Sequence, residues 1–184
     1  MKIHRIYAIF LRNMFSFRRS LDRLADSFYW ITLDLIIWGM TGVYFQSISE
    51  NSQSIIFSII SGVILWNIVF RTQSDINVSI LEELWNKNLI NLFVSPLKFS
   101  EFLLSLVLLG IVKAVATLAF GSFLGWLLFG INLFGYSIHL AIFFLSLSMT
   151  GIWMGFLISS IVLRFGSRIQ TIAWTLIWIL SPFS

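Results

Sequence analysis

Long hydrophobic runs alternate with short polar intervals along most of this chain. The runs cover about residues 28–48, 55–70, 101–129, 138–163 and 169–184. A helix needs about 20 predominantly apolar residues to cross ~30 Å of hydrocarbon, and these runs approach or exceed that length. The pattern predicts an all-α membrane protein. We expect a polytopic helical bundle with four complete spans and a fifth that is still continuing at Ser184.

The N-terminal segment, residues 1–27, has a different pattern. Its apolar residues recur at steps of three and four, which is helical spacing. They are Ile3, Tyr7, Phe10, Met14, Phe17, Leu21 and Leu24. Arginine and lysine fill much of the remaining surface. We predict an amphipathic helix in the membrane interface, with its cations toward anionic headgroups. The alternative is an amphipathic helix packed on other protein.

The polar interval at residues 71–100 is longer than a connection between two spans requires. Ser79 and Glu82 have the spacing of a capping box, which predicts a helix from Ser79 to about Val94. Glu83 lies four residues before Lys87, the spacing of a helical ion pair worth only ~0.3–0.5 kcal/mol. We therefore predict a polar helix between the second and third spans, with two adjacent glutamates near its start.

Lysine and arginine are confined to alternate polar intervals. Apart from Lys113, they occur in the N-terminal segment, in the interval 71–100 and at residues 164–168. The two intervals between these contain none. The positive-inside bias therefore predicts that the N-terminus and the interval 71–100 are cytoplasmic.

The composition favours a protein that lies mostly in lipid and has no catalytic centre. Hydrophobic residues make up 58% of the 184 residues and charged residues only 11%, against about 25% charged in an average soluble domain. There is no cysteine, and the two histidines, His4 and His139, lie far apart. Neither a G-x-x-x-x-G-K-[ST] phosphate-binding loop nor a G-x-S-x-G turn occurs. We predict no catalytic site, no metal site and no cofactor, and therefore a protein that is not an enzyme.

Two charged residues, Asp34 and Lys113, lie inside the predicted spans. At ~1.5 Å per residue, Lys113 lies roughly 16 Å from Phe102, near the middle of the membrane. A lysine at that depth is expected to face protein or water rather than lipid. Three interpretations stay open: an ion pair between Asp34 and Lys113, a contact from Lys113 to an anionic substrate group, and two structurally satisfied polar residues.

Small residues form stripes at helical spacing on the third and fourth predicted spans. The stripes are Gly110, Ala114, Thr117, Gly121 and Gly125, and then Gly151, Gly155 and Ser159. Small side chains let helix backbones approach closely in lipid, where hydrophobicity does not drive helix association. We predict helix-packing positions at Gly121, Gly125, Gly151 and Gly155. Packing within one chain is favoured over a regulated interface.

Three stretches, in this order and with this topology, resemble a known family. RRSLDRLADSFYWITLDLIIWG (residues 18–39), LEELWNKNLINLFVSPLKFSEFL (81–103) and LRFGSRIQTIAW (163–174) are similar to permease subunits of type-2 ABC exporters. The resemblance implies a subunit that forms the substrate path across a bacterial plasma membrane. It also implies a separate ATP-binding subunit that hydrolyses ATP in trans, a permease homodimer, and no nucleic-acid partner.

In this family the cytoplasmic loop between the second and third spans couples the permease to its ATPase. The residues that the resemblance assigns to this coupling are Glu82, Glu83, Trp85 and Asn88. Relatives have six spans, so a chain that ends within a fifth is expected to be a truncated or fragmentary permease. The alternative class is a non-transporting membrane scaffold or a remnant of such a permease.

The charge distribution makes the topology testable. Reporter fusions after Ser52 and after Asn132 are expected to report the outer side of the membrane, and a fusion after Asn86 the cytoplasmic side. A pair of reporters, one active only outside and one only inside, measures this. One inverted reading among the three positions contradicts the orientation.

Overall fold

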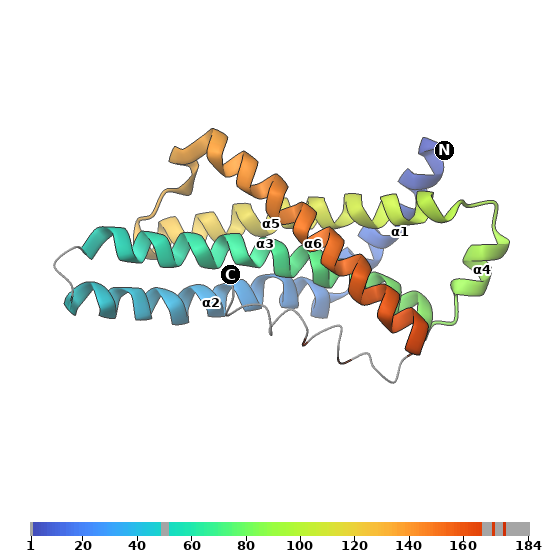
Figure 1. Cartoon of the computed structure of the whole chain (residues 1–184), viewed down its shortest axis with the longest axis horizontal. Coiled ribbons are helices and arrows are strands. Elements are labelled where there is room, and N and C mark those ends of the chain that lie inside the picture. Colours follow the sequence, from blue (N-terminus) through green and yellow to red (C-terminus); the bar gives the residue numbers. More distant parts are fainter. Residues whose placement is uncertain (1, 49–51, 167–170, 172–174, 176–184) are drawn as a thin grey trace.

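The structure is a computed structural model that describes residues 2–48 and 52–166, together with residues 171 and 175. Every regular element in this part of the chain is a helix, which confirms the all-α prediction. The elements are α1 (Ile3–Arg19), α2 (Leu21–Ile48), α3 (Ser52–Trp85), α4 (Leu89–Val94), α5 (Phe99–Phe129), the 3-10 helix η1 (Leu133–Tyr136) and α6 (Ser137–Phe165) (Figure 1).

Four of the described helices are long and apolar enough to cross a membrane. They are α2, α3 from Ile55, α5, and α6 from Ile138. Their number and order fit a multi-pass membrane protein and match the first four hydrophobic runs. The predicted fifth run, 169–184, lies outside the described residues apart from positions 171 and 175.

Helix α3 is the centre of the bundle. Helices α2, α5 and α6 all pack on it, whereas α5 and α6 have little contact with each other, and α6 crosses α3 obliquely (Figure 1). Three clusters of buried apolar side chains lie along α3: Ile31, Leu35, Ile60, Ile64, Ile131 and Leu133, then Ile76, Ile80, Phe102 and Leu106, and finally Leu81, Ile158 and Val162. The core therefore follows one long helix.

The small residues of α5 and α6 face α3. A Cβ atom added at Gly151 would lie 2.8 Å from the backbone carbonyl oxygen of Val69, and one added at Gly155 would lie 3.3 Å from that of Gln73. Added at Gly121 or Gly125, it would lie within 3.4 Å of side chains of α3. These glycines let α6 approach the backbone of α3 and let α5 fit against its side chains.

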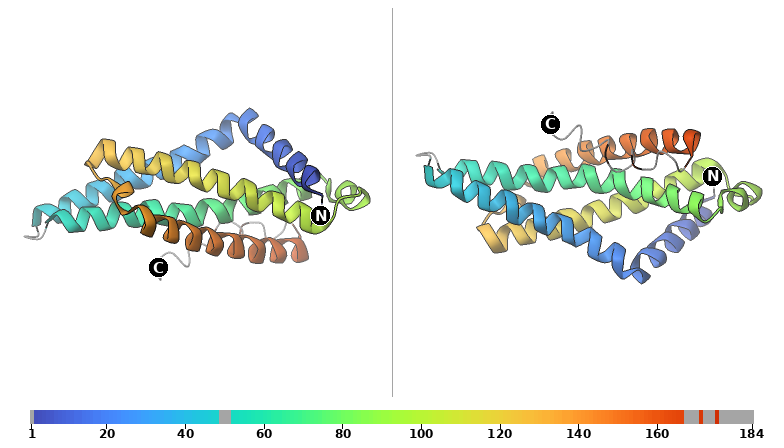
Figure 2. Two further views of the ribbon diagram at one scale, coloured as in Figure 1. Left: turned by 90° about the horizontal axis from the view of Figure 1, so that it is seen from above. Right: turned by 90° about the horizontal axis from the view of Figure 1, so that it is seen from below.

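The predicted amphipathic segment 1–27 is two elements, which corrects its end. Helix α1 ends at Arg19, and residues 21–27 belong to α2. Ser20 has extended backbone between them (φ −95°, ψ 107°), and its carbonyl accepts a hydrogen bond from the Leu24 N–H (3.2 Å). The two helices meet at an angle (Figure 2).

Hydrophobic periodicity did not predict the break at Ser20, because apolar residues continue at helical spacing on both sides of it. The charges mark it instead. Arg18 and Arg19 lie in the last turn of α1, and Asp22 lies in the first turn of α2. Cations suit a helix C-terminus and anions an N-terminus, and serine is a preferred residue just before a helix.

The predicted polar helix from Ser79 to Val94 is wrong in its start and in its continuity. Helix α3 continues without interruption to Trp85, and the Ser79 hydroxyl donates to the Asp75 carbonyl within it (2.8 Å). The chain instead turns at residues 86–88, where Lys87 has a φ of 52°. Extending a formed helix is easier than starting a new one, and the polar side chains of residues 71–85 find partners inside the bundle.

The two ends of the bundle differ. The N-terminus, α4, the end of α3 and the start of α5 gather at one end, which we call the α4 end (Figure 1). The end of α2 and the start of α3 lie at the opposite end, which we call the far end (Figure 1). Large apolar side chains of α2, α5 and α6 are exposed on the outside of the bundle, which suits helices surrounded by lipid.

Gly151→Ala is expected to destabilise the bundle, because the new methyl group must move α6 away from the backbone of α3. Overpacking of this kind costs about 1–3 kcal/mol. Gly62→Ala is the matched control, since an added Cβ at that helical position meets nothing within 4 Å. Thermal unfolding of the purified variants in one detergent measures the effect. Gly151→Ala should lower the transition temperature, and Gly62→Ala should leave it unchanged or raise it. Equal transition temperatures would contradict the close α3–α6 packing.

Candidate functional site

The polar part of α3 is buried within the bundle. Each of the seven residues from Arg71 to Asn77 is at most 7% exposed. Seven consecutive residues make about two helical turns, so α3 is surrounded on every side at this level. Buried polar groups need hydrogen bonds and buried charges need partners. The contacts of this segment therefore define the candidate site.

An ion pair between Asp75 of α3 and Lys113 of α5 lies at the centre of the site. Lys113 Nζ is 2.8 Å from Asp75 Oδ1, and the two side chains are only 11% and 8% exposed. The ammonium group also lies 4.0 Å from the ring centroid of Phe17 of α1, a cation–π contact. Lys113 is about 21 Å along α5 from Phe99. Because a buried charge without a partner is strongly destabilising, this pair holds α5 in register with α3.

Two further ion pairs join α2 to α3. Arg71 Nη1 lies 3.1 Å from Asp26 Oδ2, and Arg71 Nη2 donates to the Asp26 carbonyl (2.9 Å). Arg23 of α2 pairs with Glu82 of α3. Arg71, Asp75 and Glu82 share one face of α3, because their separations match whole helical turns. The three pairs therefore form a polar stripe along the central helix.

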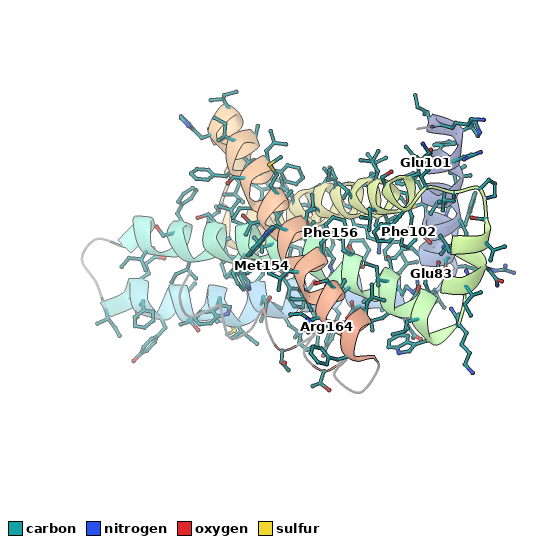
Figure 3. The ribbon with its side chains drawn as sticks, turned by 45° about the vertical axis from the view of Figure 1, so that its right-hand side comes forward. Glu83, Glu101, Phe102, Met154, Phe156 and Arg164 are labelled. Atoms are coloured by element: carbon teal, nitrogen blue, oxygen red, sulfur yellow. The ribbon has the colours of Figure 1, made fainter. Side chains whose placement is uncertain are left out.

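Glu83 joins α1 and the start of α4 to the end of α3. Its Oε1 atom pairs with Arg12 of α1, and its Oε2 atom accepts a hydrogen bond from Asn88 Nδ2 (2.6 Å). The Asn88 N–H also donates to the Glu83 carbonyl (2.9 Å). Figure 3 shows Glu83 on the side of the bundle toward α1. One carboxylate thus holds both α1 and the turn before α4.

Glu101, in the first turn of α5, is a second buried carboxylate at the α4 end (Figure 3). It accepts hydrogen bonds from the backbone N–H groups of Lys2 (2.7 Å) and Lys98 (3.2 Å) and lies 3.8 Å from Arg5 Nη1. A carboxylate that accepts from the residue before its helix is the acidic half of a capping box. That arrangement occurs at Glu101, whereas the capping box predicted at Glu82 is wrong.

A small polar cavity of about 40 Å³ lies between α1, α2, α3 and α5. Three cations and three anions line it: Arg23, Arg71, Lys113, Asp26, Asp75 and Glu82. Asp75 Oδ2 and Asn13 Nδ2 are buried there without a hydrogen-bond partner among the described residues. A polar cavity of this size has room for about two or three water molecules. Water in it would complete the hydrogen bonds of both groups.

The structure places the predicted intramembrane charges apart from each other. An ion pair between Asp34 and Lys113, one of the interpretations left open by the sequence, is wrong. Lys113 pairs with Asp75, and Asp34 Oδ2 accepts a hydrogen bond from Asn67 Nδ2 (3.1 Å). Each has a protein partner, which favours the interpretation of structurally satisfied polar residues.

The four residues assigned to ATPase coupling do not form one exposed surface. Glu83 is 8% exposed and Trp85 is 49% exposed. Glu82 pairs with Arg23, and Asn88 bonds to Glu83. The alternative role for Glu83, a helical ion pair with Lys87, is wrong, because Glu83 pairs with Arg12 and Lys87 lies in the turn after α3. Only Trp85 of this set presents a large side chain to the surroundings.

Sequence reasoning missed Arg71, Asp75 and Asp26 as members of the site. It ended the second span at Phe70 because hydropathy falls there, and it therefore placed residues 71–78 outside any helix. A signal was present nevertheless: polar residues recur at helical spacing from Arg71 to Glu82, with neither glycine nor proline between them. That pattern predicts a continued helix with one polar face.

The site links several helices through charged side chains. Its ion pairs cross the α1–α3, α2–α3, α3–α5 and α1–α5 interfaces. Among the described residues, no group of three histidine, cysteine, aspartate or glutamate side chains is placed to hold a metal ion. The chemistry that the site offers is the making and breaking of ion pairs between helices.

A double-mutant cycle tests the central ion pair. Lys113→Leu alone is expected to destabilise the protein by about 3–5 kcal/mol, because it leaves the buried Asp75 carboxylate uncompensated. Combining it with Asp75→Leu should recover much of that loss, since no buried charge then remains. Denaturant unfolding in a fixed detergent measures the four proteins of the cycle. Additive effects of the two substitutions would show that the residues do not interact.

Comparisons with known proteins identify no family for this chain. No family model matches the chain, and neither a curated protein nor a solved structure matches it.

Proposed function

We propose that the chain is the membrane-spanning permease subunit of an ATP-driven exporter of the type-2 ABC class. In this proposal it forms the substrate path across a bacterial plasma membrane as a homodimer, and its N-terminus is cytoplasmic. A separate ATP-binding subunit docks at the α4 end and supplies ATP hydrolysis. The proposal rests on the family resemblance of three stretches of sequence and on the geometry of the α4 end.

The main support for the proposal is an exposed apolar surface formed by the end of α3 and by α4, the short helix that joins α3 to α5. Trp85 at the end of α3 is 49% exposed, and Ile90 and Val94 of α4 are 72% and 81% exposed. We call these three residues the α4 surface. It lies at the end of the bundle where the basic residues predicted to be cytoplasmic gather. Exposed aromatic and aliphatic side chains at the tip of a membrane protein suit a docking partner in the adjoining solvent.

The ion pairs connect the α4 surface to the spans. Helix α4 joins α3 to α5, and Glu83 holds the turn before α4 to α1 through Asn88 and Arg12. A displacement of α4 would therefore be transmitted to α1, α3 and α5 together. In this account Glu83 is a positioning residue, which sets the geometry of the α4 surface from inside the protein. This positioning role replaces the direct docking role that the sequence suggested for Glu83.

Ile90→Ser is expected to weaken association with the ATP-binding subunit. Burial of an isoleucine side chain contributes about 1.5–3 kcal/mol, so association should weaken by roughly tenfold or more. The experiment co-expresses the chain with candidate ATP-binding subunits, co-purifies them and measures transport-coupled ATP hydrolysis. Ile138→Ser is the matched control: Ile138 is 67% exposed, close to the 72% of Ile90, but lies at the start of α6.

Equal recovery of the ATP-binding subunit with Ile90→Ser and with the unaltered chain would remove α4 from the interface. Failure of the unaltered chain to bind any such subunit or to stimulate its hydrolysis would favour the alternative, a non-transporting membrane scaffold. The two outcomes are distinct, because the first concerns one surface and the second concerns the function itself.

A further inference from the structure

An apolar groove of about 380 Å³ lies between α1 and α5, and its lining is distinct from that of the small polar cavity beside Asp75. Helix α1 contributes Ile3, Ile6, Tyr7 and Phe10, and α5 contributes Leu104, Leu108 and Val112. We call this the α1–α5 groove. Its volume falls within the ~300–1,000 Å³ of ligand pockets. The atoms that line it are all apolar, so its occupant must be apolar along the whole contact.

The groove opens on a surface that suits the interior of a bilayer. Leu104, Leu108 and Val112 are each just over 40% exposed and repeat at every turn of α5. Helix α5 is one of the four candidate membrane spans. On the other wall, Ile3 is 82% and Tyr7 is 58% exposed. A hydrocarbon chain lying along α5 would cover these side chains on both walls.

One end of the groove carries two lysines. The backbone N–H groups of Lys2 and Lys98 bond to the two oxygens of the same carboxylate, that of Glu101. Lys2 directly precedes Ile3, and Glu101 lies one turn before Leu104, so both lysines are at this end of the groove. Both are exposed, and neither side chain forms an ion pair with a residue that the structure describes.

The charge of Glu101 does not cancel the two lysines. This carboxylate is buried, accepts both backbone N–H groups and lies 3.8 Å from Arg5 Nη1. The ammonium groups of Lys2 and Lys98 are therefore available to an anion outside the protein. Two exposed cations at one end of an apolar groove match a ligand with an anionic head and a hydrocarbon tail.

We propose that the α1–α5 groove binds an anionic phospholipid, with an acyl chain between α1 and α5 and the phosphate at Lys2 and Lys98. The lipid would act as a wedge that sets the distance between α1 and α5 beside the Arg5–Glu101 ion pair. The site does not depend on the proposed export function, and its ligand is a component of the membrane itself.

Lipid binding to the purified chain tests the proposal. Native mass spectrometry in detergent would compare phosphatidylglycerol with phosphatidylcholine of the same acyl chains. The unaltered chain should prefer phosphatidylglycerol. Lys2→Gln combined with Lys98→Gln should weaken phosphatidylglycerol binding about tenfold and leave phosphatidylcholine binding unchanged, because the side-chain changes preserve the backbone bonds to Glu101. Lys87→Gln combined with Arg164→Gln removes two other cations and should preserve the preference.

Filling the groove tests the acyl chain separately from the headgroup. Leu108→Trp should reduce binding of both lipids several-fold, whereas Leu127→Trp, at an exposed position near the other end of α5, should not. Val112→Trp fills the same groove one turn away and serves if Leu108→Trp does not fold. An unchanged lipid preference in the Lys2/Lys98 variant would overturn the proposal. Full displacement of phosphatidylglycerol by free glycerol phosphate would also overturn it, because the groove would then contribute nothing.

Discussion

The burial of charge along α3 is the constraint on which the rest of this structure depends. A helix that is surrounded on every side from Arg71 to Asn77 can be stable only if each charge meets an opposite one, because an unpaired buried charge costs several kcal/mol. Asp75 requires Lys113 from α5, and Arg71 requires Asp26 from α2. The relative positions of α2, α3 and α5 are therefore specified by polar contacts as well as by the shapes of their packed side chains.

Close helix approach and charge pairing together bury the polar segment of α3. Gly151 brings α6 against the α3 backbone next to Thr72, and Ser159 of α6 donates to Asn77 of α3. These contacts bury the side of α3 that faces α6, whereas the ion pairs join α3 to α1, α2 and α5. The small cavity beside Asp75 is the exception to this close packing. Its polar lining has room for water beside the ion pairs.

Local patterning predicted the spans well and their ends poorly. The apolar runs 28–48, 101–129 and 138–163 all lie within α2, α5 and α6, because any helix in lipid must be apolar along its length. The run 55–70 is only the first part of α3, since a fall in hydropathy does not end a helix whose polar residues are paired inside a bundle. Similarly, Ser20 divides α1 from α2 although the apolar spacing continues across it.

The sequence by itself determined the all-helical class, the order of four long apolar helices and the small-residue faces through which they pack. These features are local: each depends on residues within a few turns of one another. Only the tertiary structure decided the partner of each charge, because an ion pair depends on which helices meet. Arg12 and Glu83 are 71 positions apart, and Asp75 and Lys113 are 38 apart. No periodicity links such residues, whereas the packing of α1 and α5 against α3 brings them into contact.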